Sequence, residues 1–269
     1  MLRLIAAFTL VPFMAFGASQ AELDRLHRSL STEALMGILS EEGIEQSEAL
    51  RQSMFPGRGG VGWTATAERI YATERLNNLF RTAFDTALEN SDATPLLEFY
   101  EGETGSRVAE LEVKARRAIM SDEVEDAARA AYEDIAGYGS AREELLEEFA
   151  DLNDLIDRNV AGALNANLAF MRGLGSGEGF DLSEEDILRD VWGQEASIRE
   201  DTIGWVFGFM TFAYEPLSDA QLQAYVDMTA TEAGRDLNRA LFAGFDAIFL
   251  DVSYAIGAAT GQFSLGDEL

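Results

Sequence analysis

The segment REELLEEFADLNDLIDRNVAGAL, from Arg142 to Leu164, indicates most directly how this chain folds. Its apolar side chains recur every three or four residues and acidic side chains fill many positions between them; the apolar positions include Leu145, Leu146, Phe149, Leu152, Leu155 and Ile156. That spacing puts the apolar side chains on one face of a helix. No segment alternates apolar and polar residues as a half-buried strand would, so we predict an all-α fold with about eleven helices.

Local signals also indicate where helices begin and where loops lie. Ser183 and Ser218 are placed to accept hydrogen bonds from the first amides of a helix, and Thr94 precedes a proline, a residue suited to a first helical position. Glycine-rich stretches at 56–62 (PGRGGVG) and 173–179 (GLGSGEG) are expected to be loops. Neither contains the lysine and hydroxyl of a P-loop, so we interpret both as helix connectors rather than phosphate sites.

Two segments are apolar enough to lie at the centre of the fold, Trp205–Tyr214 and Leu241–Ala259. The second is interrupted by Asp246 and Asp251, and a charge at bilayer depth is costly. We therefore expect central helices surrounded by other helices rather than membrane spans. The two aspartates are then expected to be partly buried, either as a proton or cation site or pointing out through a gap in the packing.

The chain begins with MLRLIAAFTLVPFMAFGASQA, residues 1–21, which has the pattern of a secretory signal peptide. One early arginine precedes an apolar run, and Ser19 and Ala21 are spaced for cleavage. A single-pass anchor is the rival interpretation, but the apolar run is shorter than the roughly 20 residues that a spanning helix needs. We expect cleavage after Ala21, export to the periplasm, and a mature protein that is not integral to the membrane.

Composition narrows the functional classes further. The sequence has 20 basic and 48 acidic residues, a formal net charge of −28, and no cysteine. Such a negative field repels phosphate, so binding to nucleic acid or to an anionic membrane surface is not expected. Cationic partners are compatible with the charge, although solubility alone would also explain it. The lack of cysteine excludes thiol nucleophiles, thiolate zinc sites and iron–sulfur clusters.

The chain resembles itself at an offset of 129 residues. Without gaps, residues 34–120 share 14 identities in 87 positions with residues 163–249, where composition alone would supply roughly six. We predict an ancient duplication: a first helical half at 22–136, a connecting helix at 137–162 and a second half at 163–269, sharing one core about a pseudo-twofold axis. Trp63 and Trp192 coincide at this offset and are expected to be core anchors.

The stretch FYEGETGSR, residues 99–107, contains an acid and a glycine that the offset matches with Glu232 and Gly234. The aromatic pair Phe99 and Tyr100 has no counterpart in the second copy. An acid is favoured at a helix start, where Thr231 is placed as a cap, and a glycine in the first turn lets a neighbouring helix approach. We therefore interpret Glu103, Gly105 and their counterparts as the elbow between two packed helices.

These residues carry a resemblance to a known family. A leucine-rich helix ending in an aromatic pair, the glycine five positions after Tyr100, a basic residue just beyond it (Arg107 or Arg235) and the segment LSDAQLQAY at 217–225 resemble the exported bacterial family called domain of unknown function 2059. The resemblance is strongest over 96–120 and 217–249. The chain departs from the family at 102–103 and 231–232, where Ser-Pro is usual. The resemblance implies a signal peptide followed by an all-helical body, and it implies no catalytic residues.

Candidates for chemistry are few. His27 is the single histidine, and its place near the mature N-terminus predicts a solvated helix face rather than a triad or a metal site. Two carboxylates can hydrolyse a glycoside, and Glu103 with Glu232 is the least arbitrary pair. No EF-hand calcium loop is present. We predict no catalytic residue, metal ligand or cofactor, and retain Glu103, Glu232, Asp246 and Asp251 as functional candidates.

Three functions remain open at this point. The preferred one is a non-enzymatic exported protein that binds an envelope protein or a small apolar ligand. The second is a carboxylate-dependent hydrolase of envelope glycans. The third is a helical assembly module that forms a homodimer through an amphipathic face.

Overall fold

The computed structural model describes residues 17–177 and 183–266. Within them the chain is all-α, as the sequence predicts, with thirteen helices and no strand: α1 (Gln20–Ser29), α2 (Thr32–Met54), α3 (Gly60–Ile70), α4 (Thr73–Leu88), α5 (Thr94–Tyr100), α6 (Glu103–Ala118), α7 (Asp122–Glu133), α8 (Ala141–Leu152), α9 (Leu155–Leu174), α10 (Glu184–Gly193), α11 (Glu195–Tyr214), α12 (Asp219–Thr229) and α13 (Glu232–Leu265). This count exceeds the expected number because short helices and breaks divide longer apolar patterns.

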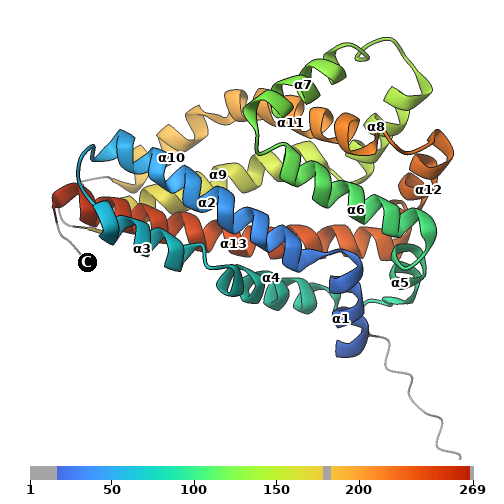
Figure 1. Ribbon diagram of the computed structural model, residues 1–269, viewed down its shortest axis with the longest axis horizontal. Helices are drawn as coiled ribbons and strands as arrows, with labels where there is room; N and C mark the ends of the chain where they lie inside the picture. The colour runs from blue at the N-terminus through green and yellow to red at the C-terminus, as the bar shows by residue number, and fades with distance from the viewer. Residues whose placement is uncertain (1–16, 178–182, 267–269) are drawn as a thin grey trace, which may run out of the picture.

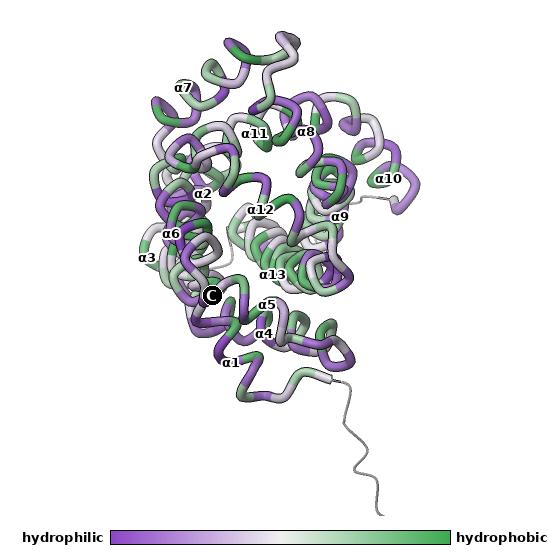
Figure 2. The backbone as a smooth tube through the Cα atoms, turned by 90° about the vertical axis from the view of Figure 1, so that its right-hand side faces the viewer, coloured by the Kyte–Doolittle hydropathy of each residue, from purple (hydrophilic) through white to green (hydrophobic). Residues whose placement is uncertain are grey.

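The long helix α13 organises the molecule. It has 34 residues, which at 1.5 Å per residue gives a length of about 50 Å. Its most extensive contacts are with α9 and α4, and Figure 1 shows it running the length of the body beside them. Figure 2, which looks along that long direction, places α13 between α9 and the pair α4 and α5, with α7 and α8 farther out.

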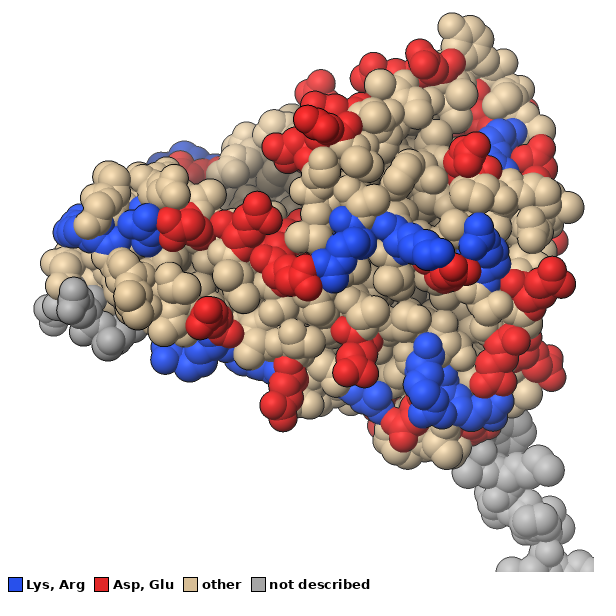
Figure 3. Space-filling model, viewed as in Figure 1, with Lys and Arg blue, Asp and Glu red and all other residues tan. Residues whose placement is uncertain are grey.

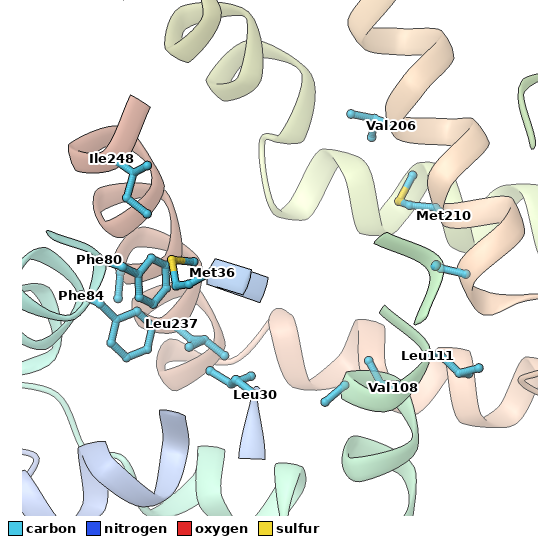
Figure 4. Packing of buried hydrophobic residues seen from close by; sticks show 14 of the residues in the cluster. Leu30, Met36, Phe80, Phe84, Val108, Leu111, Val206, Met210, Leu237 and Ile248 are labelled. Carbon is cyan, nitrogen blue, oxygen red and sulfur yellow. The ribbon is translucent and has the colours of Figure 1, made fainter. Parts of the chain in front are cut away.

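A single main hydrophobic core connects most of the helices. Phe80 and Phe84 of α4 are fully buried and lie beside Met36 of α2 and against α13 (Figure 4). A second region of the same core brings Val206 and Met210 of α11 toward α6. These contacts join segments more than a hundred residues apart into one domain.

The predicted connecting helix at 137–162 is wrong in detail, because the chain breaks at Asn153 and Asp154 into α8 and α9. Asp154 has a left-handed backbone with φ of 52°, a conformation that Asp and Asn tolerate better than most residues. The side-chain amide of Asn153 donates to the backbone carbonyl of Phe149 at 2.8 Å, which gives this carbonyl in the last turn of α8 a hydrogen-bond partner. The continuous apolar periodicity did not indicate this turn.

The apolar helix α13 is only partly surrounded by other helices, which corrects the expectation from its composition. Phe249, Leu250 and Tyr254 are each more than a third exposed. By length and composition α13 is the one helix in the described residues that could cross a membrane, a test that core helices of soluble proteins also pass. Its other side packs against α9 and α4.

The predicted helix starts are confirmed where the structure describes them. Ser183, Ser218 and Thr231 each accept a hydrogen bond from the amide three residues later, and Thr94 begins α5 with a proline in its first turn. The glycine stretches are loops only in part. Residues 56–59 of the first join α2 to α3, but its last three residues already belong to α3. The first two residues of the second stretch end α9, and its residues 178 and 179 lie outside the described part of the chain.

The two glycine elbows have the same construction. A Cβ atom added to Gly105 would lie 2.2 Å from the carbonyl oxygen of Phe99, and one added to Gly234 would lie 2.2 Å from that of Met228. Only glycine fits so close to the last turn of the preceding helix, so the interpretation of this motif as an elbow agrees with the structure.

Helix packing also follows the order expected of two related halves. Helices α2–α6 and α9–α13 come in the same sequence, with α6 and α13 starting 129 residues apart. Helix α4 packs on α13 while α11 packs on α6, which is the exchange that a twofold relation would produce. A common origin of the halves remains a prediction.

Acidic and basic side chains are interspersed on the surface shown in Figure 3. Several arginines pair with carboxylates, among them Arg25 with Glu101 at 2.6 Å. Because acids outnumber bases so strongly, these pairs leave the overall field negative.

Candidate functional site

A pocket of about 260 Å³ opens where α6, α11, α12 and α13 meet the α8–α9 turn. Its wall is dominated by aromatic rings: Tyr100, Phe149, Trp205, Phe209, Tyr214, Tyr225, Phe242 and Phe245. Val206 and Met210, which Figure 4 shows on α11, add aliphatic surface. Among the lining residues of this pocket, Glu112 is the only one with a charge.

Two tyrosines hold the carboxyl group of Glu112. The hydroxyl of Tyr214 donates to Oε1 at 2.7 Å and that of Tyr225 donates to the same oxygen at 3.0 Å. Both rings are buried, so their positions are fixed by packing. The three residues are separated by 102 and 113 positions in the chain and meet only because α6, α11 and α12 pack together.

The second oxygen of Glu112, Oε2, has no donor within residues 17–177 and 183–266. It is not sealed inside the protein either, since the buried unpartnered side-chain atoms of the described chain belong to Arg158, Thr211 and Ser264. Glu112 is half-buried and lines the pocket. Oε2 is therefore an acceptor that is open to a ligand.

Burial raises the pKa of the Glu112 carboxyl, and the hydrogen bonds from Tyr214 and Tyr225 oppose that rise. Neighbouring arginines are already paired: Arg116, one turn farther along α6, with Glu42, and Arg142 with Asp219. Neither contributes to the pKa of Glu112. An ionised Glu112 therefore has tyrosine hydroxyls as partners but no counter-charge from these arginines.

The other polar groups of the wall also present acceptors. Asn153, Asn159 and Asn238 each direct the amide nitrogen to a backbone carbonyl, at 2.8, 2.7 and 2.9 Å. Since the nitrogen must face the carbonyl, the orientation of each amide is fixed, and each amide keeps its oxygen as an acceptor and one N–H as a donor. The hydroxyl of Thr229 likewise donates to a carbonyl, that of Val226.

A wider hollow of about 900 Å³ lies between α4 and α13. Its wall consists mainly of alanine, threonine and leucine, with charges only at Glu74 and Arg75. Arg75 is already paired with Asp251. The hydroxyls of Thr82 and Thr86 donate to backbone carbonyls of α4 itself. We therefore regard the smaller aromatic pocket as the candidate site.

The structure does not bring the sequence-predicted acids into one site. Glu103 and Glu232 are exposed in the first turns of α6 and α13 and line neither hollow. Asp251 pairs with Arg75. Asp246 is half-buried, and burial raises the pKa of its carboxyl against the opposing charge of Arg158.

His27 is the clearest correction. It was expected on a solvated face, but it is only 3 % exposed. Its Nε2 lies 2.7 Å from Oδ1 of Asp85 and its Nδ1 lies 3.2 Å from the hydroxyl of Thr32. Leu23 and Leu26 are buried with His27 in α1. The face of α1 that contains these three residues is therefore turned toward the core.

Of the two tryptophans that were expected to be core anchors, only one is buried. Trp63 is fully buried and donates from Nε1 to the carbonyl of Ser47 at 3.0 Å, so it is a core anchor as expected. Trp192 is 64 % exposed, and the expectation for it is wrong.

Sequence reasoning missed Glu112, Tyr214 and Tyr225. A signal for the first was present, because Glu112 falls in the apolar stripe of α6 that contains Val108, Leu111 and Ala115. An acid in such a position faces the protein core instead of the solvent. With 48 acids in the chain, one more did not stand out.

Comparison of the chain with protein-family models, with curated proteins and with solved structures finds no match. The resemblance to the family called domain of unknown function 2059 therefore remains a prediction.

Proposed function

We propose that this is a non-enzymatic exported binding protein that holds a small ligand in the aromatic pocket beside Glu112. The observation that carries the proposal is the half-used carboxyl group: Oε1 accepts from two tyrosines while Oε2 stays accessible in a pocket with an aromatic wall. A ligand in the pocket can therefore bind Oε2 without displacing either tyrosine hydroxyl from Oε1.

The position of the pocket supports the same function. Glu112 belongs to the predicted first half, whereas Tyr214, Tyr225 and the wall of α13 belong to the second. Ligand pockets commonly form where structural units meet and combine apolar walls with a few converging polar groups. If residues 1–21 act as a signal peptide, the ligand would be met in the periplasm.

Hydrolysis of glycans is less well supported. That chemistry needs two carboxyl groups on either side of the scissile bond, and the lining of this pocket provides one. Glu103 and Glu232, the pair suggested by the duplication, lie exposed outside it.

Self-association is a second candidate, favoured by the exposed apolar residues Phe249, Leu250 and Tyr254 of α13. A solution mass twice that of the chain, lost on substitution of these residues by serine, would support it. A monomeric mass would exclude it and leave the pocket proposal untouched.

Native mass spectrometry of residues 22–269, purified from an exporting bacterial host, tests the binding function. We expect an excess mass that is released on denaturation. Leu241→Trp should abolish it, because Leu241 lines the pocket and a larger ring would fill the space. Leu250→Trp, on the exposed side of the same helix, is the matched control and should keep the ligand. Equal retention by both variants would contradict the proposed site.

A further inference from the structure

We infer that the ligand is a small organic cation, an ammonium group carrying methyl or methylene substituents, with its charge against Oε2 of Glu112 and its apolar surface against the surrounding rings. This inference rests on the proposed binding function and adds the chemical class of the ligand. It follows from the geometry of the carboxyl group, the aromatic wall and the remaining acceptors.

The carboxyl group gives the charge of the ligand. Both tyrosine hydroxyls converge on Oε1, so Oε2 keeps its full capacity to accept. An ionised carboxylate in an apolar wall is costly without a counter-charge. A cation at Oε2 would provide that charge together with a hydrogen bond or a close ionic contact.

The aromatic wall suits the rest of such a ligand. Ring faces carry negative charge density and attract ammonium groups, and rings that enclose the cation form the usual site for methylated ammonium. Here Phe149 lies 4.8 Å from Tyr225 and 5.9 Å from Tyr214 between ring centres. Phe209, stacked on Trp205 at 5.3 Å, extends the wall along α11.

Two rings of the wall already lie near cations of the protein itself. The guanidinium of Arg116 is 6.0 Å from the ring of Trp205, and that of Arg158 is 5.2 Å from the ring of Phe242. Neither arginine lines the pocket, and each also has a carboxylate partner, Glu42 and Asp154 respectively. Among the described residues, no arginine lies over Phe149, Tyr214 or Tyr225, and these rings remain available to a ligand.

The lining disfavours an anionic ligand because it contains no lysine or arginine. Its three asparagines are neutral, and each already donates one N–H to a backbone carbonyl. A phosphate or carboxylate would meet Glu112 without a positive partner. The net charge of −28 also attracts cations to the protein as a whole.

The size of the pocket limits the ligand to a small molecule. Its volume of about 260 Å³ lies just below the roughly 300–1,000 Å³ typical of sites for drug-sized ligands. A free ammonium compound with a few carbon atoms fits this volume better than a headgroup that remains attached to a lipid.

Isothermal titration calorimetry of residues 22–269 at neutral pH, after removal of any bound ligand, tests the class. The probes are choline, tetramethylammonium and 3,3-dimethylbutan-1-ol, the uncharged carbon analogue of choline. We expect saturable one-to-one binding of at least one cation and affinity for the alcohol that is lower by about tenfold or more. Equal affinity for choline and the alcohol would overturn the inference.

Variants of α6 locate the charge. Glu112→Gln keeps an acceptor for the tyrosines but removes the negative charge, and it should reduce cation affinity by about tenfold or more. Glu110→Gln, exposed on the same helix, is the matched control and should bind like the parent protein. Unchanged affinity in Glu112→Gln, with circular dichroism showing a folded chain, would also overturn the inference.

The two proposals fail in different ways. Releasable mass in the native spectrum, with no binding of either cation, would refute the cation class and leave the binding function standing. A bare monomer that binds none of the probes would refute both. Retention on phosphatidylcholine vesicles that free choline prevents would place the same ammonium chemistry in a lipid headgroup and contradict a free ligand.

Discussion

Two partly or fully buried polar clusters lie in the same helical body and differ in how completely they are satisfied. His27 uses both ring nitrogens, one toward Asp85 and one toward Thr32. Glu112 uses one oxygen for two tyrosines and keeps the other open in the pocket. A polar cluster whose hydrogen-bonding atoms all have protein partners stabilises the packing of helices. A cluster that keeps one acceptor open beside a pocket can bind a ligand.

The offset of 129 residues connects these two clusters, since it places Asp85 on Tyr214. In α4 this position is Asp85, the partner of buried His27. In α11 it is Tyr214, which donates to the carboxyl group of Glu112. If the halves share an ancestor, as we predict, the polar position was kept while its partners diverged. The ligand pocket would then occur at only one of the two places that the twofold relation makes equivalent.

The largest expected effect is on stability and comes from the histidine cluster. His27→Ala removes a buried ring packed on Phe84 and leaves Oδ1 of Asp85 without its hydrogen-bond partner. We expect the free energy of unfolding to fall by about 2–4 kcal/mol, as for other core truncations that leave a polar group unpaired. Urea denaturation measures it, with exposed Arg28→Ala as the control. Cation affinity should not change; a loss of affinity would break the distinction between the clusters.

Removing one tyrosine hydroxyl should affect both stability and binding. Tyr225→Phe keeps the ring but deletes a donor to Oε1, which should cost about 1 kcal/mol of unfolding free energy. The donor lowers the pKa of Glu112, so its loss should raise that pKa and weaken cation binding at neutral pH. Tyr254→Phe, on the exposed side of α13, is the control. Stronger binding in Tyr225→Phe would contradict the charge assignment.

Glu112→Gln should separate function from stability. Burial disfavours the ionised carboxylate, whereas glutamine is neutral and can still accept from both tyrosines. We expect the free energy of unfolding at neutral pH to rise, because the neutral side chain is not penalised by burial, while cation affinity falls. A loss of stability as large as that of His27→Ala would mean that Glu112, like His27, mainly stabilises the packing of the helices.

The smallest effect is a pair of opposite pH dependences. Burial lowers the pKa of His27 below 6.5, although Asp85 opposes this; the unfolded chain then binds a proton that the folded chain does not, and stability falls as the pH drops through that range. For Glu112 the folded pKa lies above 4.5, so the folded chain binds more protons and its contribution to stability rises as the pH falls toward 4.5.

Variants resolve the two contributions, each of which should be smaller than the effect of His27→Ala on the free energy of unfolding. Between about pH 7.5 and about pH 5, chosen to span these two shifts, His27→Gln should lose less stability than the parent protein and Glu112→Gln should lose more. The charged or titratable groups that face the two sites are Asp24, Arg81 and Asp85 for His27 and Tyr100, Tyr214 and Tyr225 for Glu112. A shift of the same sign in both variants would show that other groups dominate.

Much of the local architecture was determined by the sequence alone. The helical class followed from apolar spacing, the starts of α10, α12 and α13 from their capping hydroxyls, and the two elbows from glycines in matching places. These features depend on interactions within one or two helical turns. Neighbouring residues in the chain therefore contain the information needed to predict them.

The tertiary structure alone decided which polar residues face the interior and which of them meet. His27 is buried because its ring lies against Phe80 and Phe84 of α4. Trp192 is exposed although its counterpart Trp63 anchors the core. Glu112 became distinct among 48 acids only when tyrosines 102 and 113 positions away reached it. Burial and convergence are properties of packed helices, so a pattern that repeats every three or four residues specifies a face without specifying what that face will touch.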